Sequence, residues 1–375
     1  MDLSLDTPVW IDRPAALARL AESLSKQSQI AVDTESNSLF AYQEQVCLIQ
    51  FSTGSEDYLV DPLILDDLSP LAPIFANPAI EKVFHAAEYD LICMKRDFGF
   101  EFRNLFDTML AARILGKNTL GLRAMLEESF GIQVDKRLQR ANWAKRPLSS
   151  AMLHYARMDT HYLIALRNIL KPQLEQKERW DLAEEDFRRM TRVAAGSHEN
   201  GSANCWRISG AQDLTPRQAA VLMELCVFRD ERARASDLPP FRVLPNQTLL
   251  ELAQVMPRTR AELNNIFGLS QKLIDRFGSG ILEAVERGIV GPPAYRPPQP
   301  RVSDDVLYRM ESLRNWRKFT ARELGVESDV ILPREMVEAI AIANPTSLEG
   351  LRAILADLPW RFNRFGNRIL EVLHH

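Results

Sequence analysis

Hydrophobic and polar positions in the first half of the chain follow the periods of strands and helices in turn. Four short runs are rich in β-branched and aromatic residues, as strands are; they cover residues 29–33, 46–51, 58–61 and 82–85. Helical stretches are predicted over 86–97, 107–115, 120–130 and about 149–170. Strands that come first, with helices interleaved afterwards, predict a mixed sheet covered by helices over residues 1–194.

The second half of the chain shows no strand pattern and is predicted to be all helical. Two stretches have the composition of linkers. Residues 195–204 are small and polar, and residues 288–300 contain five prolines, which favour an extended connector. We therefore expect three domains, over 1–194, 205–288 and 302–375.

The two helical segments resemble each other at a constant spacing of 88 residues. The matching blocks are Leu244-Pro245 with Leu332-Pro333, Met256-Pro257 with Asn344-Pro345, Leu263 with Leu351, Arg276-Phe277-Gly278 with Arg364-Phe365-Gly366, and Ile281-Leu282-Glu283 with Ile369-Leu370-Glu371. Upstream, Arg229 and Arg232 match Arg314 and Arg317 at a spacing of 85, which predicts a loop that differs by three residues. The pattern indicates a duplicated helical module.

Carboxylates stand at the end of the first predicted strand, in Asp33-Thr34-Glu35. Strand residues i and i+2 project from one face, so Asp33 and Glu35 point the same way. Two like charges held together are unfavourable unless a cation lies between them. A solvated turn would have the same sequence, and a metal site is the alternative.

Further acidic positions occur on predicted helices. Asp90 lies one turn into the helix that follows the strand ending at His85, and Tyr155 and Asp159 are four residues apart, on one helical face. Each alone fits an ordinary surface or rim position. Together with Asp33 and Glu35, the two aspartates offer hard oxygen ligands that suit Mg²⁺ or Mn²⁺ and not zinc. Two such ions can promote phosphodiester hydrolysis, with Tyr155 hydrogen-bonded to the attacking water.

The order AVDTE, HAAEYD and YARMD resembles the three exonuclease motifs of the DEDD superfamily, and the Tyr-x-x-x-Asp spacing is typical of its DEDDy branch. The tandem helical modules resemble HRDC domains. This arrangement resembles the ribonuclease D family over nearly the whole chain. Shorter blocks agree with it: Leu48-Ile49-Gln50, Asp107-Thr108, and Trp143 followed by Arg146-Pro147-Leu148.

The resemblance implies an α/β exonuclease domain with a ribonuclease H-like mixed sheet, followed by two all-α HRDC-like bundles. It also implies a 3′→5′ exoribonuclease that uses two divalent ions, Mg²⁺ or Mn²⁺, and releases 5′-mononucleotides. Asp33 would bridge both ions, Glu35 and Asp159 would hold the ion beside the nucleophile, and Asp90 would serve the other. Tyr155 would orient the water. RNA with a free 3′ end, such as a tRNA precursor, would be the substrate.

Residues that could contact the nucleic acid are less sharply defined. The candidates, from the shorter blocks and a basic run, are Gln50, His85, Arg137, Arg140, Trp143 and Arg146. A structural histidine and a solvated basic loop are the alternatives, and an N-cap is sufficient to explain Asp107. Ser36 stands where the family often has a phenylalanine that packs on the terminal base, and Phe40 and Tyr42 are the candidates to replace that contact.

Composition limits the remaining possibilities. The chain has 375 residues with 46% hydrophobic and 26% charged, a net charge of −4, and no apolar run of membrane-spanning length. No signal peptide is evident, and four scattered cysteines do not form a zinc cluster or a disulfide scaffold. These features predict a cytoplasmic protein that is neither secreted nor membrane-bound.

Two rival functions remain open. Motifs of ATPases, dinucleotide-binding proteins, serine hydrolases and zinc proteases are absent from the sequence, so no nucleotide cofactor is expected. A DEDDy exonuclease that acts on DNA ends is the nearest alternative. A non-catalytic RNA-binding adaptor is the other.

Overall fold

The computed structural model describes residues 7–133, 137–196, 202–297 and 302–374. The chain divides into two compact units. The first comprises residues 1–36, 46–196 and 301–375, and the second comprises 37–45 and 197–300. Parts of both expected linkers, residues 197–201 and 298–300, lie outside the described residues.

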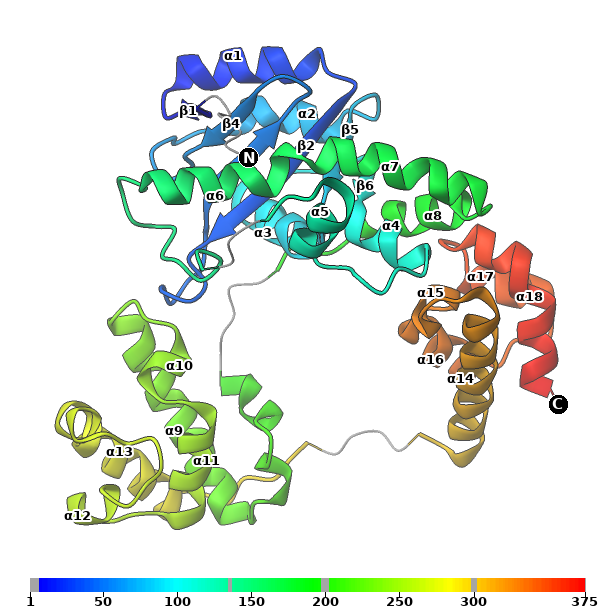
Figure 1. The fold of residues 1–375 in the computed structure, drawn as a ribbon. Helices are drawn as coiled ribbons and strands as arrows, with labels where there is room; N and C mark the ends of the chain where they lie inside the picture. Colours follow the sequence, from blue (N-terminus) through cyan, green and yellow to red (C-terminus); the bar gives the residue numbers. More distant parts are fainter. Residues whose placement is uncertain (1–6, 134–136, 197–201, 298–301, 375) are drawn as a thin grey trace. The chain divides into compact units, whose positions relative to one another are not determined.

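The first unit is built on a six-stranded mixed sheet (Figure 1). Its strands are β1 Val9–Ile11, β2 Gln29–Ser36, β3 Val46–Ser52, β4 Asp57–Val60, β5 Glu81–Phe84 and β6 Leu105–Asp107. Their order across the sheet is β1-β4-β3-β2-β5-β6. β3 runs antiparallel to both β2 and β4. The other neighbouring pairs, β1 with β4, β2 with β5 and β5 with β6, are parallel. Every residue of β3 is buried, as expected of a central strand covered on both faces.

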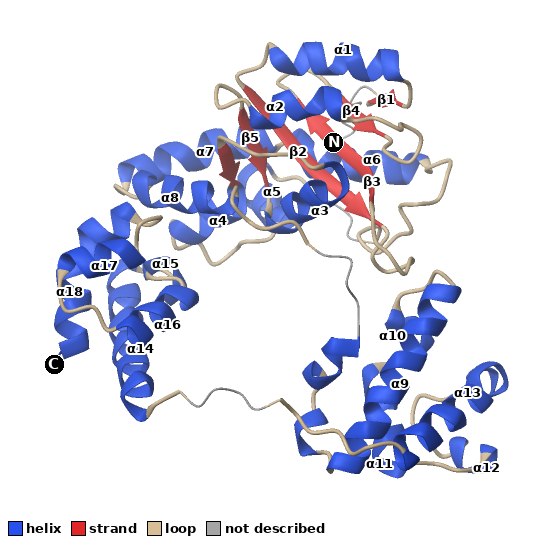
Figure 2. Cartoon of the chain, turned by 180° about the vertical axis from the view of Figure 1, so that it is seen from behind, coloured by secondary structure: helices blue, strands red, loops and turns tan. Residues whose placement is uncertain are grey.

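Helices cover the sheet on its two faces (Figure 2). They are α1 Pro14–Ser25, α2 Ala72–Ala76, α3 Glu88–Phe98, α4 Thr108–Ile114, α5 Leu122–Phe130, α6 Ser150–His161, α7 Leu163–Gln176 and α8 Trp180–Met190. The predicted fold class and the four predicted strands are confirmed, with ends shifted by up to three residues. β1 and β6 escaped prediction because each has only three residues. The single helix expected over 149–170 is wrong, because the chain breaks at Tyr162 (φ −99°, ψ −2°) into α6 and α7.

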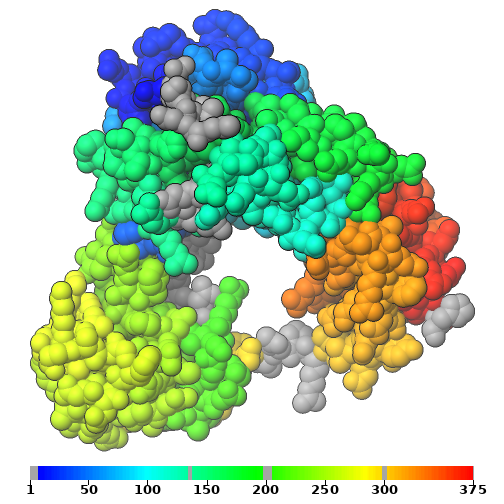
Figure 3. All heavy atoms as spheres, in the orientation of Figure 1, coloured from blue at the N-terminus to red at the C-terminus, as the bar shows by residue number. Residues whose placement is uncertain are grey.

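The second helical repeat belongs to the first unit. It consists of α14 Asp304–Leu324, α15 Ser328–Ile331, α16 Arg334–Ala343, α17 Leu348–Ile354 and α18 Pro359–His374. Its attachment to α8 is seen in Figure 3, where the orange and red atoms touch the green ones. At this junction the fully buried Arg361 donates hydrogen bonds to both carboxylate oxygens of Asp186, each at 2.8 Å, and to Glu185 at 2.5 Å.

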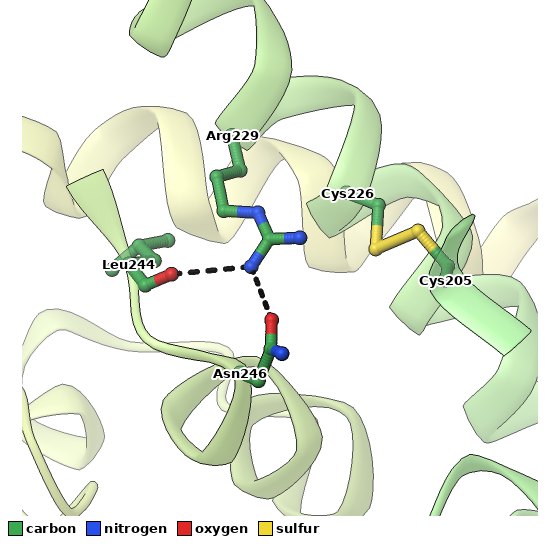
Figure 4. The surroundings of a disulfide bond; sticks show 5 residues. All are labelled: Cys205, Cys226, Arg229, Leu244 and Asn246. Carbon is green, nitrogen blue, oxygen red and sulfur yellow. Dashed lines mark hydrogen bonds between the residues drawn. A yellow bond between two sulfur atoms is a disulfide. The ribbon is translucent and has the colours of Figure 1, made fainter. Parts of the chain in front are cut away.

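The second unit contains the first helical repeat and the loop of residues 37–45. Its helices are α9 Pro216–Ala235, α10 Pro240–Val243, α11 Asn246–Val255, α12 Arg260–Leu263 and α13 Gln271–Val290, so residues 288–290 of the expected linker are helical. A disulfide joins Cys205 in the short helix η2 (Ser202–Arg207) to Cys226 in α9 (Figure 4). Sequence reasoning missed this pairing, because 21 residues separate the two cysteines and no motif links them.

The two repeats have the same helices in the same order, and corresponding helices begin 88 residues apart, from α9 with α14 to α13 with α18. The described residues of both segments contain no strand. Matching aromatic pairs meet edge to face: Phe228 with Phe277 at 6.3 Å between ring centroids, and Trp316 with Phe365 at 5.7 Å.

The predicted three-residue difference upstream is wrong. Arg229 donates to the carbonyl of Leu244 at 3.3 Å, and Arg317 donates to the carbonyl of Leu332 at 2.8 Å (Figure 4 shows the first). Arg229 therefore corresponds to Arg317, at the same spacing of 88. The R-x-x-R pattern led to the wrong spacing because it can be matched at either of two arginines.

Among the described residues of both units, none of the helices combines the length and hydropathy that crossing a membrane requires.

Candidate functional site

Three carboxylates gather where β2 meets α6. Asp33 and Glu35 occupy the second half of β2, and Asp159 lies in the last turn of α6. One oxygen from each side chain lies within 4.8 Å of the others, a spacing that suits a shared cation. Alternation along the strand brings Asp33 and Glu35 to one face, as predicted, and the β-bulge follows only after Glu35.

Asp90 lies next to this trio but is not part of it. It occupies the first turn of α3, is 7% exposed, and accepts a hydrogen bond from the hydroxyl of Thr34, between the two carboxylates of β2. Burial is the main cause of the raised pKa values of Asp33, Glu35 and Asp159, and the charge of Asp90 adds to it. The structure thus brings three of the four predicted carboxylates into one cluster and places the fourth beside it.

The electrostatics of the cluster favour bound cations. Withdrawal from water, followed by repulsion from the neighbouring carboxylates, raises the pKa of Asp33 and of Glu35 well above the ordinary values. The pKa values of Asp90 and Asp159 rise to about 7, mainly through burial. Such shifts mean that the negative charges are poorly compensated by the protein. A divalent cation would supply the missing charge.

Tyr155 lies one helical turn before Asp159 and donates a hydrogen bond to its carboxylate, which lowers the pKa of Asp159 against the larger effect of burial. Burial and the three nearby carboxylates raise the pKa of the Tyr155 phenol, so this hydroxyl stays protonated and can donate. Its ring lies 5.9 Å from the ring of Trp143. Trp143 therefore packs against Tyr155.

Asp107 organises the loop that leads into α3. Its carboxylate caps α4 by accepting from the backbone N–H groups of Met109 and Leu110, which agrees with the expected N-cap. It also accepts from the N–H groups of Ala86, at 3.1 Å, and Ala87, at 2.7 Å. These bonds hold Ala86 at a positive φ of 61° and so set the start of the helix that carries Asp90.

The carboxylates open into a cleft of about 390 Å³. Besides them it is lined by residues from several segments of the first unit: Thr34, His85, Ala86, Gly121, Leu122, Arg123, Gln139 and Tyr155. His85 thus lines the site, and its Nδ1 shares a 2.9 Å hydrogen bond with the hydroxyl of Thr108. Sequence reasoning missed Arg123 and Gln139. A single arginine on a helix carries no signal that could have identified it.

The predicted nucleic-acid contacts need correction. Gln50 and Trp143 are 0% and 1% exposed, so neither meets solvent. Arg146 forms a two-pronged ion pair with Asp61, at 2.5 and 2.7 Å, and contributes to the packing around β3. The other two arginines of the basic run, at 137 and 140, are exposed, and Gln139 between them reaches the cleft.

The two candidate substitutes for a base-stacking residue, Phe40 and Tyr42, have other contacts in this structure. Tyr42 is 7% exposed, and its hydroxyl donates to Asp230 at 2.8 Å inside the second unit. Phe40 lies under the guanidinium of Arg242, 4.4 Å from its ring centroid. Both rings contact the first helical repeat, and a role for either in stacking on a base stays a prediction.

Comparisons with known proteins cover nearly the whole chain. A family model for 3'-5' exonuclease matches residues 8–175, and one for the HRDC domain matches 218–285 and 307–373. Ribonuclease D of Pseudomonas paraeruginosa is 30% identical over 378 residues, which cover 97% of each chain. Protein RRP6-like 1 of Arabidopsis thaliana is 31% identical over 348 residues, 89% of this chain.

Among solved structures, RNase D of Escherichia coli, described as an exoribonuclease involved in structured RNA processing, matches with a TM-score of 0.70. It is 27% identical, and the match covers 98% of this chain and 99% of that one. The chain spans about half the length, or less, of the eukaryotic relatives that it matches.

Proposed function

Because the chain belongs to the ribonuclease D family, we propose that it is a metal-dependent 3′→5′ exoribonuclease that releases 5′-mononucleotides from RNA. The observation that carries this proposal is the cluster of Asp33, Glu35 and Asp159, whose oxygens lie within 4.8 Å of one another. Asp90 beside them supplies a fourth carboxylate. An adaptor without catalytic activity would have no need to maintain these mutually repelling charges.

The residues would hold two divalent cations, Mg²⁺ or Mn²⁺, as cofactors. The donors are hard carboxylate oxygens, and their raised pKa values indicate that positive charge is missing. Asp33 would serve both ions, Glu35 and Asp159 would hold the ion beside the nucleophile, and Asp90 would hold the second. When bound, such ions lower the pKa of water and stabilise the negative charge that develops on the oxygens of the phosphodiester.

The protein's own groups would orient the substrate. Tyr155 is placed to hold the attacking water with the same hydroxyl that contacts Asp159 in this structure. His85, Arg123 and Gln139 line the cleft and are the candidates for contact with the terminal nucleotides. Arg123 is the cation among them, and phosphate contacts by arginine position a nucleic acid without reading its sequence.

The substrate we propose is RNA with a free 3′ end, and tRNA precursors are the specific expectation. Relatives named ribonuclease D support an RNA substrate, and so does the similarity to E. coli RNase D, described as an exoribonuclease involved in structured RNA processing.

The boundaries of the three domains and the cytoplasmic location stay predictions. Fractionation of cells would test the second of these.

A digestion assay tests the proposal. RNA labelled at its 5′ end should be shortened one nucleotide at a time when Mg²⁺ is present, and should stay intact with chelator. The same RNA with a blocked 3′ hydroxyl should resist. Internal cuts, or digestion that is unaffected by chelator, would refute the proposed reaction.

DNA ends are the alternative substrate, and the same assay decides between them. A single-stranded DNA of identical sequence should be degraded more slowly than the RNA if the family resemblance extends to the substrate. Equal or faster degradation of DNA would favour the rival function and would leave the metal site unchanged.

A further inference from the structure

A buried polar network holds α6 on the side of the helix that faces away from the candidate site. Its centre is Asp57, the first residue of β4, which is 7% exposed. The Asp57 carboxylate accepts hydrogen bonds from Arg157 Nε at 2.5 Å and from His161 Nδ1 at 2.8 Å. Both donors belong to α6, the helix that carries Tyr155 and Asp159.

The end of β3 extends the network. Ser52 pairs with Asp57 in the β3–β4 register and donates its hydroxyl to the Asp57 carboxylate at 2.6 Å. The same hydroxyl lies 2.7 Å from the hydroxyl of Thr160 on α6, and both of these residues are 0% exposed. The contacts of Arg157, Thr160 and His161 therefore attach the last turn of α6 to the β3–β4 hairpin.

Helix geometry links this attachment to the site. Residues advance by about 100° around a helix, so Asp159 lies about 160–200° away from Arg157 and His161, whereas Tyr155 and Asp159 share a face. Fixing the first pair therefore fixes the direction of the second. Slippage of α6 by one residue would move Asp159 by about 1.5 Å along the axis and rotate it by about 100°.

We propose that Asp57 is a positioning residue for the nuclease site: by holding Arg157 and His161 it sets the rotation of α6 that presents Asp159 and Tyr155 to the cleft. This inference rests on the proposed function. The side chain of Asp57 touches neither substrate nor metal and acts only through α6. Removal of a group that hydrogen-bonds directly to a metal ligand typically changes metal affinity or activity by about 10- to 100-fold, and we expect an effect of this order for Asp57 because it fixes the helix that carries a ligand.

The test compares two buried carboxylates that each pair with an arginine. Asp57→Asn removes the charge that holds α6, and Asp186→Asn does the same at Arg361, beside α8 and away from the cleft. We would measure Mn²⁺ binding by calorimetry, well below the melting temperature of each variant, and also kcat and KM on RNA. Asp57→Asn should weaken Mn²⁺ binding about 10- to 100-fold and lower kcat with little change in KM. Asp186→Asn should bind Mn²⁺ like wild type.

A folded Asp57→Asn protein with wild-type Mn²⁺ affinity and kcat would overturn the proposal. If Asp57→Asn does not fold, His161→Ala serves instead, because that side chain is 28% exposed and Arg157 keeps its partner. His161→Ala should weaken Mn²⁺ binding in the same direction but less, and no change would overturn the proposal. Wild-type protein that binds no Mn²⁺ and digests no RNA would instead refute the proposed function itself.

Discussion

Two carboxylate clusters of the first unit differ in how their charge is compensated. At the junction of α8 and the second helical repeat, Glu185 and Asp186 surround the guanidinium of Arg361. In the cleft, Asp33, Glu35 and Asp159 face one another, and among the described residues none of them forms an ion pair with a lysine, arginine or histidine.

The difference separates a structural cluster from a functional one. The junction is complete in itself, since every carboxylate has hydrogen bonds to a cation of the same chain. Burial raises the pKa of Glu185 at the junction, but there the charge and hydrogen bonds of Arg361 act against it. In the cleft the neighbouring carboxylates add to the effect of burial and raise the pKa values of Asp33 and Glu35 further. Uncompensated charge of this kind is costly for folding, so its presence points to a ligand that supplies the opposite charge.

The first helical repeat differs from the second at the position of Arg361. The spacing of 88 residues aligns Arg361 with Leu273, which lies in α13 and carries no charge. The first repeat therefore lacks the central group of the junction. It contacts the loop of residues 37–45 instead, where Asp237 accepts a hydrogen bond from the N–H of Tyr42 at 3.0 Å. The duplicated fold is shared, and the attachments are specific to each copy.

The largest expected effect is on the cleft. Asp33→Asn removes a charge from the centre of the trio, and the rate of RNA digestion should fall by about 10³-fold or more because a charge-stabilising group is lost. Single-turnover digestion with excess enzyme measures this. The melting temperature without metal should not fall, since one of the repelling charges is gone. If Asp33→Asn is inactive because it is unfolded, its inactivity would not support a functional role for the carboxylates of the cleft.

The junction should respond in the opposite way. Arg361→Ala leaves Glu185 and Asp186 buried without a cation, which should cost about 3–5 kcal/mol of stability in urea unfolding. Mn²⁺ affinity at the cleft should stay at the wild-type value. Arg192→Ala is the matched control, because its ion pair with Asp357 is exposed and such pairs contribute little. An equal loss in both variants would contradict the view that the junction depends on buried charge.

Tyr155→Phe should separate water positioning from metal binding. It removes one hydroxyl and keeps all four carboxylates, so the rate should fall by about 10²–10³-fold. Mn²⁺ binding, measured by calorimetry, should remain near wild type. Full activity in a single-turnover assay would mean that this tyrosine only packs against Trp143.

The smallest effect concerns pH in the absence of metal. The pKa of Asp159 is about 7 in the folded protein and 3.8 in the unfolded reference, so the folded state binds more protons between these values. Stability should therefore fall as pH rises from about 4 to 7. Asp159→Asn should flatten this dependence, and so should saturating Mg²⁺. Melting curves at several pH values would show it, and a steeper fall with Mg²⁺ would contradict the account.

Much of the fold could be predicted from the sequence because local pattern determines it. The strands that contain Asp33 and Gln50 have clear β composition, and the constant spacing of 88 residues identifies the repeats. The order of the motifs led to the carboxylates. Short strands and the break at Tyr162 could not be predicted, since tertiary packing and not local preference sets them.

The nucleic-acid contacts were harder to predict, for a physical reason. A basic or aromatic residue looks the same in a sequence whether it faces RNA or a buried partner. Arg146 pairs with Asp61 and Trp143 packs on Tyr155, both through contacts that no local pattern shows. Arg123 reaches the cleft only because α5 folds beside β2 and α6.

Calorimetric titration of the metal-free protein with Mn²⁺ tests most directly whether the uncompensated carboxylates form a metal site. Wild-type protein should bind Mn²⁺ and release protons as it does so, because Asp90 and Asp159 have pKa values of about 7 before the metal binds. Asp33→Asn should bind much more weakly, and Arg361→Ala should bind like wild type. Wild-type protein that binds no divalent cation, or an Asp33→Asn variant that binds as tightly, would contradict the account.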